Sequence, residues 1–116
     1  MSKIRIQQVF QNLISNSIKF NDKKEGKISI EAQKLSNGNY EFSVEDNGCG
    51  ISETDLPNVF KIFKTFRNSP QDTGLGLAIV KKIITLFGGD LSVSSILGKQ
   101  TIFKFSLPEK FIISQK

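Results

Sequence analysis

The sequence has no histidine, no tryptophan and a single cysteine. Without histidine, the chain cannot form a Ser-His-Asp triad, a histidine-ligated zinc site or an imidazole general base. Because Cys49 has no partner for an internal disulfide, we expect a reducing, cytoplasmic compartment. No hydrophobic run approaches the roughly 20 residues that cross a bilayer. Chemistry in this chain must therefore use carboxylates, amides, lysines, hydroxyls or backbone N–H groups.

The 116 residues are enough for one domain with one core. Their net charge is +5, a balance that suits phosphate-bearing ligands. The lysines are spread along the chain, which is typical of a solvated surface, and we expect no nucleic-acid partner.

Apolar residues at helical spacing predict a long helix over 3–20. Those on its apolar side are Ile6, Val9, Phe10, Leu13, Ile14 and Phe20. A second, broadly apolar helix is expected over 75–87, where Gly88-Gly89 ends it. Between the two, Ser52 has the pattern of an N-cap for a short helix over 53–60.

Alternating apolar residues predict four strands in two hairpins. Asn37-Gly38 and Gly98-Lys99 mark the two turns. The strands are expected over 27–35, from residue 40 onward, over 90–97 and over 100–107. We therefore predict one α/β domain over 1–116: a two-layer sandwich whose mixed, mostly antiparallel sheet carries helices on one face, with 109–116 as a tail.

A polar stripe borders the apolar side of the first helix. Gln8, Asn12, Asn16 and Lys19 fall within an arc of about 80° at 100° per residue. Amides and an ammonium in such a stripe can bind a phosphate chain and its magnesium, since Mg²⁺ prefers oxygen ligands. A polar helix flank with no ligand explains the same pattern.

Two glycine-containing segments are further candidates. Asp46 to Gly50 follows a strand, and its carboxylate can accept a hydrogen bond from a ligand amino group; an ordinary loop with an Asx-turn is the alternative. Thr73 to Leu77 opens the second helix, where exposed N–H groups favour an anion. The second segment is neither a dinucleotide fingerprint nor a P-loop, and glycines for tight helix packing are its alternative.

Together and in order, these motifs resemble the N, G1, F and G2 boxes of sensor histidine kinases. The motifs are Asn12-x-x-x-Asn16-x-x-Lys19-Phe20, Asp46-x-Gly48-x-Gly50, Phe60-x-x-Phe63 and Thr73-Gly74-Leu75-Gly76-Leu77-Ala78-Ile79-Val80-Lys81. The resemblance runs from about residue 4 to residue 108. It implies a catalytic and ATP-binding domain with the Bergerat fold of the GHKL superfamily.

The resemblance also implies roles. Asn16 would hold Mg²⁺, with Asn12 and Lys19 near the phosphates as the catalytic residues, and Asp46 would accept the adenine amino group. The full set implied to bind ATP is Asn12, Asn16, Lys19, Asp46, Gly48, Gly50, Thr73, Gly74, Leu75, Gly76, Leu77 and Thr101. ATP-hydrolysing relatives carry a glutamate at the position of Asn12. An amide cannot take a proton from water, so the resemblance implies ATP held for transfer.

The chain departs from the family in its lid and its acceptor. The implied ATP lid, 67–73, is short and resembles that of phytochrome-type kinases, and Asp72 stands where a glycine is usual. Lys64 or Arg67 would supply positive charge there. The phosphoacceptor histidine belongs to a separate dimerisation hairpin, so we expect an excised, monomeric domain from a longer kinase, membrane-anchored or not, with a response regulator downstream. An anti-sigma-factor-type serine kinase and a non-catalytic nucleotide-sensing module are the alternatives.

Overall fold

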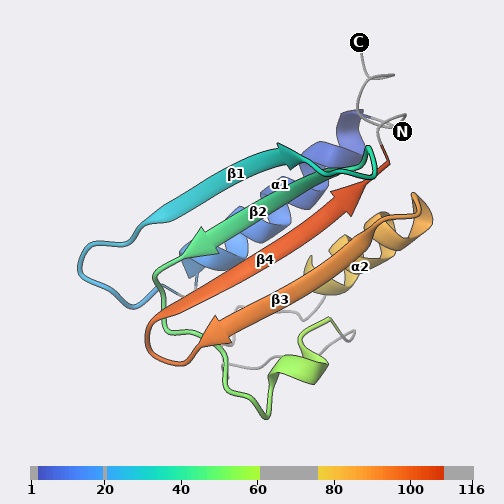
Figure 1. The fold of residues 1–116 in the computed structure, drawn as a ribbon. Coiled ribbons are helices and arrows are strands. Elements are labelled where there is room, and N and C mark those ends of the chain that lie inside the picture. The colour runs from blue at the N-terminus through green and yellow to red at the C-terminus, as the bar shows by residue number, and fades with distance from the viewer. Residues whose placement is uncertain (1–2, 20, 61–75, 109–116) are drawn as a thin grey trace.

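Two helices and a four-stranded sheet form two layers, with both helices behind the sheet in the view of Figure 1. The computed structural model describes residues 3–19, 21–60 and 76–108. Its elements are α1 (Lys3–Lys19), β1 (Ile28–Lys34), β2 (Tyr40–Asp46), the 3-10 helix η1 (Leu56–Asn58), α2 (Gly76–Leu86), β3 (Asp90–Ile96) and β4 (Gln100–Leu107). No helix in these ranges is long and apolar enough to cross a membrane. The expected tail, 109–116, lies outside them.

The sheet has the strand order β1-β2-β4-β3. The two predicted hairpins, β1–β2 and β3–β4, are present, and β2 joins them by pairing with β4. The prediction of a largely antiparallel sheet with helices on one face is therefore confirmed. Every pairing among the described strands is antiparallel, so the parallel pair that a mixed sheet needs is not found within these ranges.

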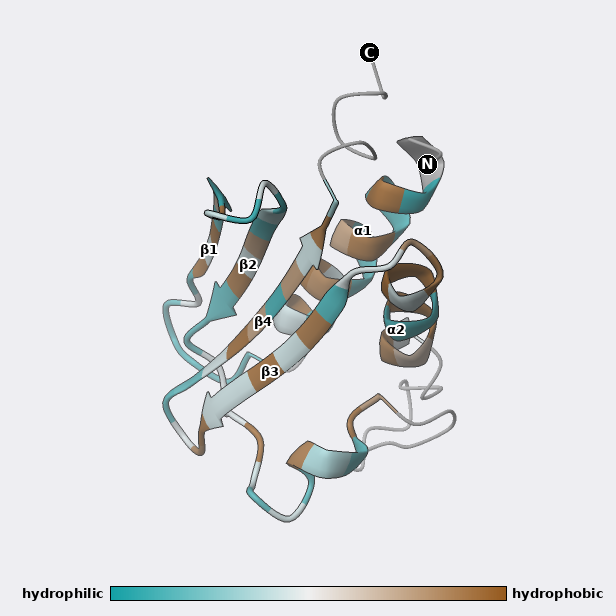
Figure 2. Ribbon diagram, turned by 45° about the vertical axis from the view of Figure 1, so that its right-hand side comes forward, coloured by the Kyte–Doolittle hydropathy of each residue, from teal (hydrophilic) through white to brown (hydrophobic). Residues whose placement is uncertain are grey.

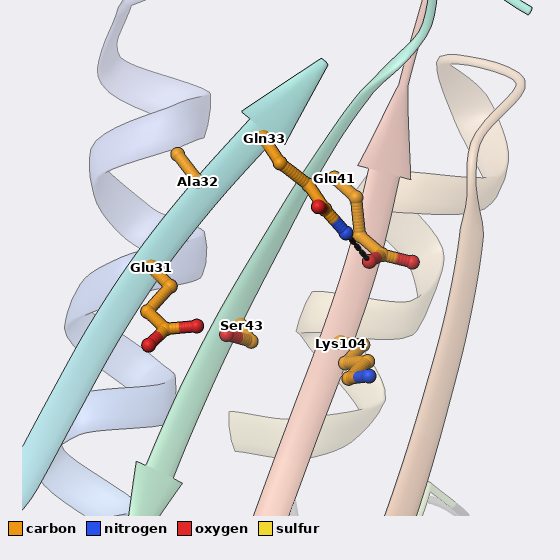
Figure 3. A pocket seen from close by; sticks show the side chains of 6 residues that line it. All are labelled: Glu31, Ala32, Gln33, Glu41, Ser43 and Lys104. Carbon is orange, nitrogen blue, oxygen red and sulfur yellow. Dashed lines mark hydrogen bonds between the residues drawn. The ribbon is translucent and has the colours of Figure 1, made fainter. Parts of the chain in front are cut away.

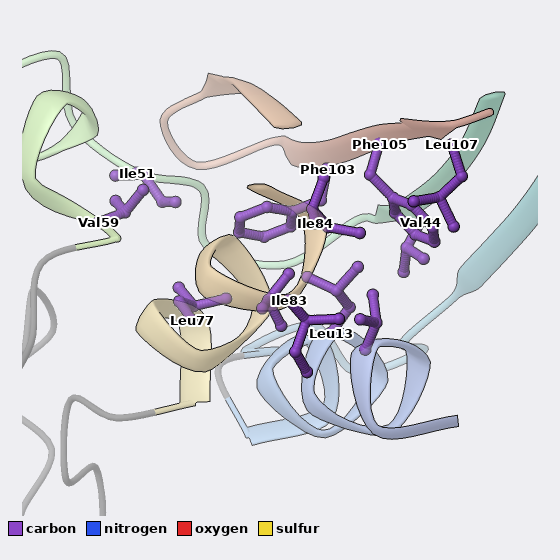
Figure 4. Packing of buried hydrophobic residues seen from close by; sticks show 12 residues of the cluster. Leu13, Val44, Ile51, Val59, Leu77, Ile83, Ile84, Phe103, Phe105 and Leu107 are labelled. Atoms are coloured by element: carbon purple, nitrogen blue, oxygen red, sulfur yellow. The ribbon is translucent and has the colours of Figure 1, made fainter. Parts of the chain in front are cut away.

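The core lies between the helices and the inward-facing residues of β2 and β4 (Figure 4). From α1, Val9 and Leu13 are fully buried, as the helical period predicts. The Phe10 ring packs edge-on against Phe42 of β2 and Phe105 of β4, with ring centroids 5.7 and 5.3 Å apart. Buried aliphatic and aromatic side chains thus hold α1 against the middle of the sheet.

The apolar helix α2 packs beside α1 and against β3 and β4, and strands β3 and β4 carry alternating hydrophobic and hydrophilic bands (Figure 2). Helix α2 ends at Leu86, and Gly88, two residues later, has a φ of +76°. The N–H of Gly88 donates to the Thr85 carbonyl at 3.1 Å and that of Gly89 to the Ile84 carbonyl at 2.9 Å. This pair of bonds is a Schellman motif, which explains why the two glycines end the helix.

The prediction of a short helix over 53–60 is wrong in its extent. The chain forms a turn over 53–55 and then only η1. Pro57 is the physical reason, because it has no N–H to donate to the Glu53 carbonyl and its ring would collide with that carbonyl. The predicted cap is present, since the Ser52 hydroxyl accepts the Asp55 N–H at 3.2 Å.

The other face of the sheet carries polar side chains and a shallow groove of about 390 Å³ (Figure 3). The groove is lined by Glu31, Ala32, Gln33, Glu41, Ser43 and Lys104. Gln33 donates to Glu41 across the β1–β2 pair at 2.9 Å. None of the predicted site residues lines this groove, so the candidate site belongs to the helix-facing side.

Candidate functional site

A row of three polar side chains crosses the helix-facing side of the sheet at one end. Asp46 of β2 lies opposite Thr101 of β4, which lies opposite Ser95 of β3. The neighbouring row on the same face is apolar, formed by Val44, Phe103 and Val93. Residues directly opposite one another in antiparallel strands have neighbouring side chains. On this side of the sheet, the side chains therefore change from apolar to polar between one row and the next.

Asp46 ends β2 and is 5% exposed. Its Oδ1 accepts the N–H of Gly48 at 2.8 Å, which bends the chain sharply at the end of the strand. Gly48 and Gly50 are both buried in the loop that follows. A buried carboxylate placed in this way can take a donor from a ligand, as predicted for this segment.

The loop after Asp46 contacts the β3–β4 turn through backbone atoms. Gly50 has a φ of +72°, and a side chain there would collide with the Ile96 carbonyl and come within 2.8 Å of the Leu97 Cα. The N–H of Gly98 donates to the Cys49 carbonyl at 2.6 Å. Gly50 is therefore needed because two stretches of backbone touch at that point.

Asn47 joins the end of β2 to the segment after α1, although sequence reasoning passed over it. Its Oδ1 accepts hydrogen bonds from the Asn21 side chain at 2.9 Å and from the Lys27 N–H at 2.8 Å. Its Nδ2 donates to the Glu25 carbonyl at 3.0 Å. These three hydrogen bonds of the Asn47 side chain thus hold the segment after α1 next to the end of β2.

Asn12 and Asn16 lie one turn apart on α1 and are partly exposed. The Nδ2 atom of each is nonetheless buried and has no hydrogen-bond partner in the part of the chain that the structure describes. The Asn12 amide also lies at the start of α2, because a Cβ built on Gly76 would stand 3.9 Å from Asn12 Oδ1. The structure thus places the Asn12 amide beside the N-terminus of α2, with Asn16 one turn further along α1.

The remaining predicted residues are exposed, belong to the core or lie outside the described residues. Lys19 is the last residue of α1 and is exposed. Leu77 is 7% exposed and its side chain belongs to the core, so only its backbone can face a ligand. Phe60 also packs on the core, with its ring centroid 6.0 Å from that of Phe103. Thr73, Gly74, Leu75, Phe63, Lys64 and the lid 67–73 lie outside the described residues.

Two hydroxyls at the site were missed from the sequence. Ser17, next to Asn16, is 1% exposed, and its Oγ has no partner among the described residues. A hydroxyl one turn after Leu13, on the apolar side of α1, was the available signal. Ser95 was missed because its bonds to Ile51 and Gln100 join segments that are distant in sequence or belong to a turn.

Comparison with known proteins identifies a protein family. The family model described as histidine kinase-, DNA gyrase B-, and HSP90-like ATPase matches residues 1–110. Cyanobacterial phytochrome A of Nostoc sp. is 42% identical over 106 residues, which cover 90% of this chain and 14% of that protein. The chain thus spans about one seventh of the length of this relative.

Solved structures of histidine kinases share the fold. The mycobacterial sensor histidine kinase MprB aligns with a TM-score of 0.84 and 25% identity, over 93% of this chain and 74% of that one. Full-length ShkA, solved in complex with AMPPNP, aligns with a TM-score of 0.77 and 31% identity, over 90% and 21%. The chain therefore belongs to the histidine kinase-, DNA gyrase B- and HSP90-like ATPase family, as an ATP-binding domain of the sensor histidine kinase type.

Proposed function

We propose that this domain binds Mg·ATP and donates the γ-phosphate to a histidine on a separate dimerisation hairpin, from which a response regulator is then phosphorylated. One observation carries the proposal: two amide nitrogens, Asn12 Nδ2 and Asn16 Nδ2, are buried without a partner among the described residues. A buried polar group that the protein leaves unpaired costs about 1–3 kcal/mol. Phosphate oxygens would accept from both nitrogens.

The start of α2 supports a phosphate at the same place. The first N–H groups of a helix have no partner inside it, and the helix dipole favours negative charge there. Asn12 Oδ1 stands near Gly76, the first residue of α2. The predicted contribution of Lys19 is a further positive charge at the phosphates.

The same amides fit a magnesium ion. Mg²⁺ takes oxygen ligands, keeps several waters and is commonly shared between protein and substrate phosphates. Asn16 Oδ1 is the oxygen we assign to it. When bound, the ion would offset the negative charge of the triphosphate.

The adenine would lie at the polar row of the sheet. Asp46 would accept the 6-amino group, and Gly50 would let the base lie against the backbone of its loop. Transfer breaks the bond between the γ-phosphorus and the bridging oxygen, and ADP keeps that oxygen. The unprotonated imidazole nitrogen of the acceptor takes the phosphoryl group, and the other ring nitrogen releases its proton. The protein's share is positioning and charge stabilisation, which does not need a base of its own.

Thermal unfolding with Mg·ATP, Mg·GTP or no nucleotide tests the proposal. A ligand at a hundred times its Kd adds about 2.7 kcal/mol, which for a chain of this size raises Tm by about 11 °C. We expect that shift with ATP and little with GTP. Equal shifts with both nucleotides, or no shift with either, would contradict the proposed adenine site.

Asp46→Asn sharpens the test. Asparagine can keep the bond from the Gly48 N–H while placing an NH₂ where the second carboxylate oxygen stood, so the ATP-dependent shift should disappear with the unliganded Tm nearly unchanged. Glu45→Gln is the matched control, because the exposed Glu45 precedes Asp46 on the same strand and faces away from the helices. It should behave as the wild type.

A further inference from the structure

The Ser95 hydroxyl has its hydrogen bonds fully assigned by its neighbours. It accepts the backbone N–H of Ile51 at 2.7 Å and donates to the Gln100 carbonyl at 2.7 Å. A third contact, 3.1 Å long, joins Ser95 Oγ to Thr101 Oγ1. A serine hydroxyl carries one proton and two lone pairs. Since the carbonyl can only accept, the single proton of Ser95 goes to Gln100.

The direction of the third hydrogen bond follows. With its proton used and one lone pair occupied by Ile51, Ser95 can meet Thr101 only as an acceptor. Thr101 is therefore the donor, and its hydroxyl is directed toward β3. Asp46 lies on the other side of Thr101, on β2. The Thr101 proton is thus held away from the Asp46 carboxylate.

We infer that Ser95 is a positioning residue for base recognition, because it holds the Thr101 proton away from Asp46 and so leaves only hydrogen-bond acceptors of these two residues for a base. This inference rests on the proposed adenine site. A base bound there must bring donors, as the 6-amino group of adenine does. The 6-oxo group of hypoxanthine or guanine can only accept hydrogen bonds, so its lone pairs would face the lone pairs of Asp46 and Thr101 unfavourably.

Ser95→Ala would release the Thr101 proton. The freed hydroxyl could donate to Asp46, competing with the adenine amino group, or to a 6-oxo group, favouring the wrong base. Both consequences lower the same quantity, the ratio of Kd for ITP to Kd for ATP. We expect a decrease of about tenfold, the effect of one mispaired buried polar group.

The test measures Kd for Mg·ATP and Mg·ITP by calorimetry in four proteins: wild type, Ser95→Ala, Thr101→Val and the double variant. Ser95→Ala should lower the ratio in the wild type and leave it within about twofold in the Thr101→Val background, because no Thr101 proton remains there. A general loosening of the loop would lower the ratio in both backgrounds and overturn the inference. An unchanged ratio in Ser95→Ala, with ATP still bound, would overturn it too.

Controls separate this inference from the proposed function and from misfolding. Ser95→Thr keeps the hydroxyl and should keep the wild-type ratio, as should Ser94→Ala on the exposed, outward side of β3. If Ser95→Ala fails to fold, Ser95→Cys should lower the ratio, because a thiol is a weak acceptor. A wild-type protein that binds neither nucleotide would overturn the proposed function together with the inference.

Discussion

At the scale of single residues, Asn12 and Asn16 are suited to the phosphates of a nucleotide because each amide offers both an acceptor and a donor. The oxygen can take a metal ion while the nitrogen donates to phosphate, a combination that a carboxylate cannot supply without repelling the triphosphate. Burying two unpaired nitrogens is unfavourable in the free protein. That cost is recovered when a ligand pairs with them.

Asn16→Ala therefore separates the metal role from the phosphate role. Removing Oδ1 and Nδ2 should weaken binding of Mg·ATP by about tenfold or more, since a metal contact and a bond to a charged group are both lost. Magnesium-free ADP should lose less, because only the bond from the nitrogen is affected. Calorimetric titration of both ligands measures the difference. Equal losses would remove the metal from Asn16.

Gln11→Ala is the matched control for this variant. Gln11 carries an amide on the same helix, but its side chain is exposed, unlike the partly buried Asn16. Affinity for both ligands should stay at the wild-type value. A loss in Gln11→Ala similar to that in Asn16→Ala would indicate that α1 responds to any truncation.

At the scale of elements, helices and hairpins could be predicted from the sequence because their signals are local. The period of Val9 and Leu13, the Asn37-Gly38 turn and the Gly88-Gly89 stop each act within a few residues. The extent of the helix after Ser52 was misjudged for a local reason too, the missing N–H of Pro57. By contrast, the hydrogen bonds from Asn47 to Asn21 and from Ile51 to Ser95 join segments far apart in sequence, so no short window of sequence contains them.

The contact between the Asp46–Gly50 loop and the β3–β4 turn gives a prediction on stability. Gly50 and Gly98 have nearly the same φ, +72° and +79°, but a side chain at Gly50 would meet backbone, whereas nothing lies within 4 Å of a side chain at Gly98. Gly98→Ala should cost about 1–2 kcal/mol, the cost of a left-handed conformation. Gly50→Ala should cost about 3 kcal/mol or more, since overpacking adds to it.

Urea unfolding of the two variants measures this difference directly. Because the two glycines share their backbone conformation, the excess cost at Gly50 reports the steric contact alone. Equal free energies of unfolding for Gly50→Ala and Gly98→Ala would mean that the loop can move away from the turn. The proposed adenine site would then be less rigid than the contact at Gly50 indicates.

At the scale of the whole molecule, the proposed function depends on two chemical groups that the sequence does not supply. The chain has no histidine, so a phosphohistidine acceptor must be supplied by another segment or another protein. In the proposed site, the residue next to the phosphates is Asn12, whose amide is not basic enough to activate water. Under the proposed function, we therefore expect the domain to keep ATP intact until an acceptor reaches it.

Incubation of the purified chain with Mg·ATP should therefore release no phosphate above the buffer control over many hours.

Adding a dimeric hairpin that carries the acceptor histidine should then produce an acid-labile, alkali-stable phosphoprotein, because a phosphoramidate is formed. Asp46→Asn should produce none, since it removes the base contact but adds no hydrolytic group. Rapid multiple turnover by the chain alone would contradict the argument from Asn12, and transfer to a serine protein in place of the hairpin would favour the serine-kinase alternative.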